Sequence, residues 1–356
     1  MSGALDEAGA VRVGEELDAE RLDAFLRVHI EGLDGLPAIR QFAGGASNLT
    51  YLVRYPNRDL VLRRPPFGAR AKSAHDMLRE ARIMVALKPH YPYVPEVLAL
   101  GEQVDVIGCE FYVMQRIVGV IPRRDLPPEP ALDAGATRQL CRNVIERLVE
   151  LHALDARQPE LAAIGRGEGY VARQLEGWTE RWRRALTDDV GDCARVIAWL
   201  EERRPARDAA TCVIHNDFRF DNLVLDAADP MRVIGVLDWE MATLGDPLMD
   251  LGNALAYWVQ ADDDAGFRST RRQPTDAPGM LTRDEVVAYY AERSGRRIDD
   301  FAFYRVFGLF RLAVIVQQIY RRWRDGHAAN PQFAQFGAIA NLLGARCLAT
   351  IDRAPR

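Results

Sequence analysis

The stretch that decides the fold is "VIHNDFRFDNLVLD", residues 213–226, which places many short polar side chains between two apolar segments. The apolar segments are "CVI" (212–214) and "LVL" (223–225), and they predict a strand, a turn and a second strand that close a hairpin. Asparagine and aspartate are common in turns, so a polar hairpin turn is one interpretation. A catalytic loop is the other, and the rest of the chain has to decide between them.

The spacing within this stretch carries chemical information. His215, Asp217 and Asn222 form the pattern H-x-D-x-x-x-x-N, which has the spacing of a kinase catalytic loop. In that chemistry the aspartate orients the attacking hydroxyl and accepts its proton, and the asparagine supplies a neutral oxygen to a metal ion. We therefore predict Asp217 as the catalytic residue and Asn222 as a metal ligand, while His215 braces the loop.

A second carboxylate follows at the end of an apolar segment. Residues 233–237 predict a buried strand that ends at Asp238, in "VIGVLDWEMATLGDP". Mg²⁺ prefers oxygen ligands and takes few of them from protein, so Asp238 is the second predicted metal ligand beside Asn222. The alternative is an aspartate that only starts a turn, but Asp217, Asn222 and Asp238 together favour a site.

Composition and charge limit the class of protein. The 356 residues predict one or two domains, and the net charge of −5 argues against a general nucleic-acid binder. The five cysteines are scattered without a C-x-x-C pair, which argues against a zinc site or disulfide framework and fits a reducing compartment. The apolar segment at 306–319 is interrupted by Arg311 and is expected to fall short of a membrane span. We expect a cytoplasmic protein without nucleic-acid or membrane partners.

The order of patterns along the chain predicts an α+β fold with two lobes. A helix capped by Asp18 precedes a β-rich region, which contains one helix over residues 73–88. After a linker near residues 115–119, helices dominate, and "TRDE" at 282–285 has the spacing of a capping box. We place the β-rich nucleotide-binding lobe at residues 1–117 and the helical lobe at 118–356, and expect a ligand cleft between them.

Two features of the β-rich region add to this hypothesis. The glycine turn "FAGGASN" (42–48) lets backbone N–H groups approach phosphates, although a plain hairpin is the more common outcome. In the helix that follows, Glu80 shares an apolar stripe with Met77, Met84 and Leu87, and no cation lies within one turn of it. A buried carboxylate needs a partner, so we predict an ion pair with Arg63 of the preceding strand. The alternative is a solvated Glu80 at the edge of the stripe.

Other polar residues carry weaker signals. His29 and His152 are expected to be packing or surface histidines rather than ligands. Asp246 and Asp250, in "GDPLMDL", are expected to hold the catalytic loop by hydrogen bonds, with capping of the next helix as the alternative.

"HNDFRFDNLVLD" followed by "VIGVLDWEMATLGDPLMDL" resembles the aminoglycoside phosphotransferase and choline kinase-like superfamily. Within it, "FAGGASNLTYLV", "LVLRRPP" and "FYVMQRIVG" resemble the kinase-like domain that is also found fused to acyl-CoA dehydrogenases. The resemblance runs over about residues 41–324. It implies a bilobal protein-kinase-like fold and ATP- or GTP-dependent phosphorylation of a small molecule with Mg²⁺.

The resemblance also implies roles for individual residues. Gly45 belongs to the glycine loop, Ser47 and Asn48 would lie over the nucleotide phosphates, and the segment from Gln115 to Ile117 would form the hinge that contacts the base. Arg63 stands where kinases carry the phosphate-binding lysine, with Glu80 as its helix partner. An arginine there is the main departure from the pattern, but its guanidinium holds phosphate oxygens bidentately.

We expect a small-molecule kinase whose partners are a nucleotide and a hydroxylated substrate, and the sequence sets no oligomeric state. Four arginines among apolar residues, in "FRLAVIVQQIYRRWRDG" (310–326), suggest an anionic or acyl-type acceptor such as a hydroxyacyl-CoA. A core helix with arginines on its wet side is the alternative. An aminoglycoside-type kinase and a catalytically silent nucleotide-binding module stay open. A protein kinase is disfavoured because "WE" follows Asp238 and no activation segment or A-P-E follows.

Overall fold

The computed structural model describes residues 6–43, 48–67, 76–328 and 330–354. These residues form two compact units, each made of separate stretches of sequence. The β-rich unit comprises Met1–Ile121, Pro127–Pro130 and Asn222–Ala242. The helical unit comprises Pro122–Leu126, Ala131–Asp221 and Thr243–Arg356.

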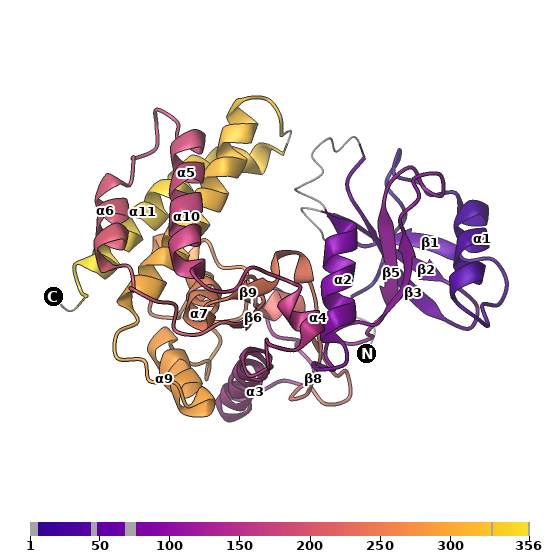
Figure 1. The fold of residues 1–356 in the computed structure, drawn as a ribbon, viewed down its shortest axis with the longest axis horizontal. Coiled ribbons are helices and arrows are strands. Elements are labelled where there is room, and N and C mark those ends of the chain that lie inside the picture. Colours follow the sequence, from indigo (N-terminus) through magenta and orange to yellow (C-terminus); the bar gives the residue numbers. More distant parts are fainter. Residues whose placement is uncertain (1–5, 44–47, 68–75, 329, 355–356) are drawn as a thin grey trace. The chain divides into compact units, whose positions relative to one another are not determined.

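The β-rich unit is built on an antiparallel sheet of five strands in the order β1-β2-β3-β5-β4. The strands are β1 (Ala38–Gln41), β2 (Leu49–Arg54), β3 (Asp59–Arg64), β4 (Val97–Gly101) and β5 (Phe111–Gln115). Figure 1 shows helix α1 (Ala19–His29) against one face of this sheet and helix α2 (Met77–Leu87) along the other. The core below α1 includes Leu22, Leu26, Tyr51 and Phe111, all fully buried.

Both helices of this unit begin where the sequence places a cap. The Asp18 side chain accepts hydrogen bonds from the backbone N–H groups of Glu20 and Arg21, as predicted. The Asp76 side chain accepts one from Arg79 at the start of α2. The predicted apolar stripe of α2 is buried, and it includes Glu80 at 1% exposure, so the alternative of a solvated Glu80 is wrong.

A distant segment of the chain, Asn222–Ala242, completes the β-rich unit. It forms the two-stranded sheet of β7 (Leu223–Leu225) and β8 (Val233–Val236), followed by a 3₁₀ turn at Trp239–Met241. The N–H of Val236 donates to the carbonyl of Tyr93, and Arg79 of α2 donates to the carbonyls of Glu240 and Ala242. The predicted boundary after residue 117 assigns this segment to the helical lobe, whereas these contacts group it with the β-rich unit.

The helical unit contains nine described α-helices and one short sheet. The helices are α3 (Ala134–His152), α4 (Pro159–Ala162), α5 (Tyr170–Ala185), α6 (Ala194–Arg203), α7 (Pro247–Ala256), α8 (Ala265–Arg268), α9 (Arg283–Ser294), α10 (Ala302–Arg324) and α11 (Phe336–Ile351). The sheet pairs β6 (Cys212–Ile214) with β9 (Thr243–Gly245). Helix α10 is central, because it packs against α5, α7 and α11. The capping box of α9 forms as predicted between Thr282 and Glu285.

The predicted hairpin of residues 212–225 is wrong. Its two strands do not pair with each other: β6 pairs with β9 and β7 pairs with β8. Each strand has three residues, and such short apolar segments carry little information about which partner they choose. The polar stretch is therefore a loop between two sheets, followed by a 3₁₀ turn at Phe220–Asn222.

The expectation for the apolar segment at 306–319 also needs correction. Helix α10 extends over 23 residues, so α10 and the segment Pro331–Ile351 are long and apolar enough to match a membrane span. The apolar window of α10 is 61% buried inside the protein. Packing against neighbouring helices therefore explains its composition.

Candidate active site

The site in the β-rich unit is organised by a buried ion pair. Arg63 of β3 donates from Nη1 to Oε1 of Glu80 in α2 at 2.5 Å. Both side chains are buried, with 11% and 1% of their side-chain surface exposed. The ion pair predicted from the apolar stripe of α2 is therefore present. It links the sheet to the helix inside the core of this unit.

Tyr112 and Asp238 complete the surroundings of the Arg63 guanidinium. Tyr112 lies opposite Arg63 in the β3–β5 ladder, and its hydroxyl is 3.4 Å from Arg63 Nη1. Burial alone would lower the pKa of Arg63, but the negative charges of Glu80 and Asp238 hold it well above its usual range. Burial raises the pKa of Glu80, and the Arg63 charge opposes that rise. The cation at this position is permanent, since an arginine does not deprotonate in proteins.

The hairpin of β7 and β8 brings the two predicted metal ligands to the same end of a ladder. Leu223 pairs with Val236, and the N–H of Leu237 donates to the carbonyl of Asn222 at 2.8 Å. Asn222 therefore lies across from the residue that precedes Asp238. Asp238 adopts the left-handed conformation, with φ 67° and ψ 64°. This conformation is sparsely populated by residues other than glycine and is enriched at functional sites.

The donor set at this end of the hairpin fits Mg²⁺. Arg63 contacts Oδ1 of Asp238 at 3.3 Å, whereas Oδ2 makes no hydrogen bond to any residue that the structure describes. About a third of the Asp238 side chain, 31%, is exposed. One open carboxylate oxygen and one amide side chain match the sparse oxygen ligation that Mg²⁺ accepts from proteins.

The glycine loop (42–48) is described only at its two ends, residues 42–43 and 48. Gly45 and Ser47 lie outside the described residues. Asn48 is buried, and its side-chain amide donates to Oε2 of Glu240 at 2.9 Å. Glu240 is the second residue after Asp238, so the end of the loop is tied to the predicted metal-ligand segment. This contact was not predicted from the sequence.

The predicted hinge follows β5. Gln115 ends the strand, pairs with Leu60 and donates its N–H to the carbonyl of Glu96. Ile117 packs on Gly235 in β8, where a Cβ atom would lie only 2.9 Å from Ile117 Cδ1. The glycine therefore allows the hinge segment to approach β8 closely.

The polar loop in the helical unit is held by a buried carboxylate. Asp250 of α7 accepts hydrogen bonds from the backbone N–H groups of His215 and Asn216, both at 2.7 Å. Its Oδ2 also contacts Nε2 of His152 at 3.0 Å. Burial alone would raise the pKa of Asp250, but its bonds to His152 and the nearby His215 lower it below the usual value. Asp250 thus holds the loop, as predicted.

The neighbouring Asp246 has a different role. Its side chain caps α7 by accepting from the N–H groups of Leu248 and Met249, and it accepts a further bond from Ala209. The alternative of helix capping is therefore correct for Asp246. His152 is neither a surface nor a simple packing histidine, since its Nδ1 lies 2.7 Å from the hydroxyl of Tyr290.

Asp217 lies in this loop beside an arginine. Its N–H donates to Nδ1 of His215 at 3.2 Å, so His215 braces the loop as predicted. Arg219 pairs with Asp217 at 3.4 Å and with Asp221 at 3.1 Å. The guanidinium of Arg219 also lies 4.6 Å from the ring centre of Tyr257. The carboxylate predicted to accept a proton therefore has a cation next to it.

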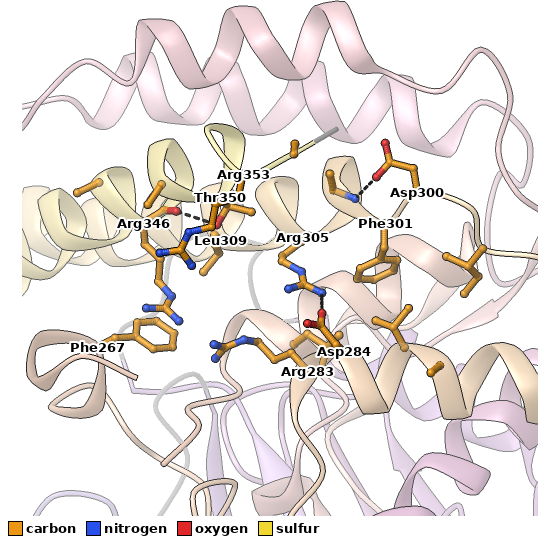
Figure 2. Close-up of a pocket in the computed structure, with 18 of the residues that line it drawn as sticks. Phe267, Arg283, Asp284, Asp300, Phe301, Arg305, Leu309, Arg346, Thr350 and Arg353 are labelled. Atoms are coloured by element: carbon orange, nitrogen blue, oxygen red, sulfur yellow. Dashed lines mark hydrogen bonds and ion pairs between the residues drawn. The ribbon is translucent and has the colours of Figure 1, made fainter. Parts of the chain in front are cut away.

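The helical unit also contains a pocket of about 770 Å³ between α9, α10 and α11. Figure 2 shows arginines among its lining residues, with Arg305 directed at the carboxylate of Asp284. Arg305 pairs with Asp284, Arg283 pairs with Asp263, and Arg346 lies 3.8 Å from the centre of the Phe267 ring. None of the predicted site residues lines this pocket. It is separate from the loop that carries Asp217.

Comparison with known proteins agrees with this geometry. The sequence profile of the phosphotransferase enzyme family matches residues 38–292, most of the chain. The chain belongs to the phosphotransferase enzyme family. The resemblance stated from the sequence motifs is thereby confirmed.

The curated relatives are longer proteins. The chain is 35% identical over 321 residues to acyl-CoA dehydrogenase family member 10 of Mus musculus, a match that covers 88% of this chain and 30% of that protein. It is 31% identical over 352 residues to acyl-CoA dehydrogenase family member 11 of Gallus gallus, covering 95% of this chain and 44% of that protein. The chain spans less than half the length of either relative.

Solved structures confirm the predicted kinase-like fold of this phosphotransferase family. A crystal structure from Ralstonia eutropha JMP134, provisionally named an aminoglycoside phosphotransferase, is 30% identical with a TM-score of 0.81, covering 96% of this chain and 100% of that one. The aminoglycoside phosphotransferase APH(4)-Ia, solved in complex with AMP-PNP and hygromycin B, is 17% identical with a TM-score of 0.59. That match covers 94% of this chain and 99% of the other, and it shows the fold alone.

Proposed function

We propose that this phosphotransferase is a small-molecule kinase that transfers the γ-phosphoryl group of ATP or GTP to a hydroxyl. The observation that carries the proposal is the grouping of Arg63, Asn222 and Asp238 in the β-rich unit. It supplies a permanent cation for phosphate oxygens and two oxygen ligands for Mg²⁺. The sequence predicts the same three residues independently of the structure.

The proposed reaction follows from the chemistry of the named side chains. Asp217 orients the acceptor hydroxyl and takes its proton as the oxygen forms a bond to the γ-phosphorus. The bond from that phosphorus to the bridging oxygen breaks, which releases a nucleoside diphosphate and a phosphomonoester. Asn222 and Asp238 would hold Mg²⁺, which supplies positive charge to the phosphates when bound. Catalysis is then mainly positioning and neutralisation of charge.

Several residues would hold the nucleotide in this proposal. Arg63 contacts phosphate oxygens and is itself aimed by Glu80, which fixes one side of the guanidinium. Asn48 would lie over the phosphates, and Gly45 and Ser47, which the sequence predicts for the same role, lie outside the described residues. Gln115 and Ile117 present backbone groups to the base. The ties of Asn48 to Glu240 and of Ile117 to Gly235 keep these segments close to the metal-ligand hairpin.

For the acceptor we propose an anionic or acyl-type metabolite, with a hydroxyacyl-CoA as the leading candidate. Two observations support this choice. The curated relatives carry the name acyl-CoA dehydrogenase, and α10 contains Arg311, which is buried with an Nη1 atom that makes no hydrogen bond within the described part of the chain. A polycationic aminoglycoside would instead need a pocket rich in unpaired carboxylates.

The transfer assay that tests the proposal runs over a panel of hydroxyacyl-CoAs, other hydroxylated metabolites and aminoglycosides, with Mg·ATP and Mg·GTP. Asp217→Ala should lower kcat by about 100-fold or more, the scale of positioned proton transfer. Asp238→Ala should abolish the thermal shift caused by Mg·nucleotide. Asp226→Ala is the matched control, because that carboxylate lies in the same segment and pairs with Arg232. Near-normal turnover of Asp217→Ala would refute the assignment.

A nucleotide-binding module without transfer activity is the second candidate, and one observation favours it. Arg63 contacts the predicted metal ligand Asp238 directly, so the cation engages the carboxylate that Mg²⁺ would use. In that case nucleotide would bind equally well with and without Mg²⁺, and Asp238→Ala would leave binding unchanged. A Mg²⁺-dependent shift together with phosphoryl transfer to any acceptor would exclude it.

A further inference from the structure

Arg311, in the middle of α10, is buried without a charge partner. It has 4% of its surface exposed, and its Nη1 atom is buried with no hydrogen bond. No carboxylate pairs with it in the part of the chain that the structure describes. A buried charge is costly unless it is paired and hydrogen-bonded. The protein therefore maintains an uncompensated cation at this position.

The neighbour of Arg311 across the Trp178 ring is a second cation, Arg181, and not a carboxylate. Its guanidinium lies 5.1 Å from the centre of the Trp178 ring in α5, and that of Arg181 lies 4.6 Å from the same ring. Burial lowers the pKa of Arg181, and the charge of Arg311 lowers it further. Two guanidinium groups thus share one indole ring, an arrangement that stabilises cations only partly.

The other arginines of α10 provide an internal contrast. Arg321 pairs with Asp325 at 2.8 Å, and Arg324 pairs with Asp188 and Asp189. The alternative of solvated arginines on the wet side of a core helix is therefore correct for this end of α10. Arg311 differs from them in both burial and lack of a carboxylate.

The Arg311 site is connected to the loop that carries Asp217. Helix α5 begins at Tyr170, whose hydroxyl donates to the side-chain oxygen of Asn216 at 2.9 Å, next to Asp217. Trp178 follows eight residues later in α5, a separation of about 12 Å at about 1.5 Å per residue. Burial raises the pKa of Tyr257, the Asp217 charge adds to the rise, and the Arg311 charge opposes it.

We propose that Arg311 and Arg181, beside Trp178, bind an oxyanion of the phosphate acceptor, a carboxylate or a phosphate. The inference rests on the proposed function and deepens it. The hydroxyl that receives the phosphoryl group lies at Asp217, and the anion lies beside Trp178, about two turns of α5 beyond the tyrosine that bonds to Asn216. A guanidinium matches both kinds of oxyanion through bidentate hydrogen bonds. The site therefore selects acceptors by the distance between hydroxyl and anion.

The first test measures phosphoryl transfer to ω-hydroxycarboxylates of increasing chain length, each compared with its neutral methyl ester, and to the corresponding hydroxyalkyl phosphates. Wild-type protein should prefer the anion over the ester, most strongly at one chain length. Arg311→Met should lower kcat/KM for the anion by about 10- to 100-fold and remove the preference over the ester. Arg311→Lys should restore part of it. Arg321→Met is the control on the same helix and should leave the preference intact.

The second test separates this inference from the proposed function. The thermal shift of the full chain is measured with Mg·ATP and, separately, with the ω-hydroxycarboxylates alone. Arg311→Met should keep the nucleotide shift and lose the carboxylate shift. An anion preference or carboxylate shift that survives in Arg311→Met would overturn the inference while the kinase assignment stands. Absence of transfer by wild type, with an Arg311-dependent carboxylate shift, would overturn the assignment and leave the anion site standing.

Discussion

Arg63 and Arg311 are both buried arginines, but their surroundings are opposite. Arg63 lies in the β-rich unit against Glu80 at 2.5 Å, with Asp238 at 3.3 Å. Arg311 lies in the helical unit against the ring of Trp178, and the described residues provide it with no carboxylate. One guanidinium is neutralised by the protein, and the other is not.

This difference distinguishes a buried cation that the protein itself pairs with carboxylates from one that it leaves without a carboxylate among the described residues. The Arg63–Glu80 pair links sheet and helix and balances the two charges without any bound molecule, although Arg63 Nε and Glu80 Oε2 are buried without a hydrogen bond to any described residue. Arg311 has no such function in the fold, and its burial costs free energy that an anionic ligand would recover. The comparison therefore predicts that truncating Arg63 and truncating Arg311 change the free energy of unfolding differently. The tests below run from the largest expected change to the smallest.

The largest effect is expected from Glu80→Ala. Removing one partner of a buried ion pair leaves the other charge uncompensated, which costs about 3–5 kcal/mol of unfolding free energy. Chemical denaturation measures the change. Glu102→Ala is the control, because Glu102 pairs with Arg82 at the surface and 59% of its side chain is exposed. If both variants lose the same small amount, Arg63 is not supported by Glu80.

A smaller loss of unfolding free energy is expected from Asp250→Asn. This variant extends the comparison to a buried carboxylate whose hydrogen bonds come mainly from backbone N–H groups. Loss of its charged hydrogen bonds should cost about 1.5–3 kcal/mol at neutral pH. The pKa of Asp250 is below its ordinary value of 3.8 in the folded protein, so its contribution is complete above that value and lost as the pH falls below it. Denaturation curves at several pH values should show wild type and variant converging in acid. A constant difference would contradict the pKa direction.

The double variant Arg63→Met/Glu80→Leu sharpens the comparison within one site. Both charges are removed together, so no uncompensated ion remains, and the unfolding free energy should stay within about 1 kcal/mol of wild type. The Mg·nucleotide thermal shift should disappear, because the cation for phosphate is gone. Stability as low as in Glu80→Ala would show that the pair is needed for the fold itself.

The smallest effect on stability is expected from Arg311→Met. The substitution removes an unpaired buried cation, so the unfolding free energy should be unchanged or higher by about 1 kcal/mol. Arg63→Met is the comparison, since it leaves Glu80 buried without its partner and should be clearly destabilised. If Arg311→Met lost as much unfolding free energy as Arg63→Met, the two buried arginines would not differ in their contribution to stability.

The sequence predicted the features that depend on local pattern. The apolar stripe around Glu80 indicated a buried carboxylate, and the absence of a nearby cation pointed to Arg63. The apolar segment before Asp238 indicated a strand, which is present as β8. In each case neighbouring residues were sufficient, because helix and strand periodicity determine which side chains are buried.

Features that depend on distant residues were missed. Strands of three residues did not reveal their partners, so the pairing of β6 and β7 was predicted incorrectly. His152, Asp250 and Tyr290 are far apart in sequence, and no local pattern connects them. Arg311 was grouped with Arg321 and other arginines of α10, because sequence alone does not show which of them have carboxylate partners.

The segment Asn222–Ala242 has a consequence for how the protein can be divided. It belongs with the first 121 residues, although about 100 residues of the other unit separate them in the chain. Any fragment that ends near residue 121 would carry Arg63 and Glu80 without Asn222 and Asp238. The proposed nucleotide site therefore draws on both sides of this interval, and a truncation or domain graft within residues 122–221 would separate its residues.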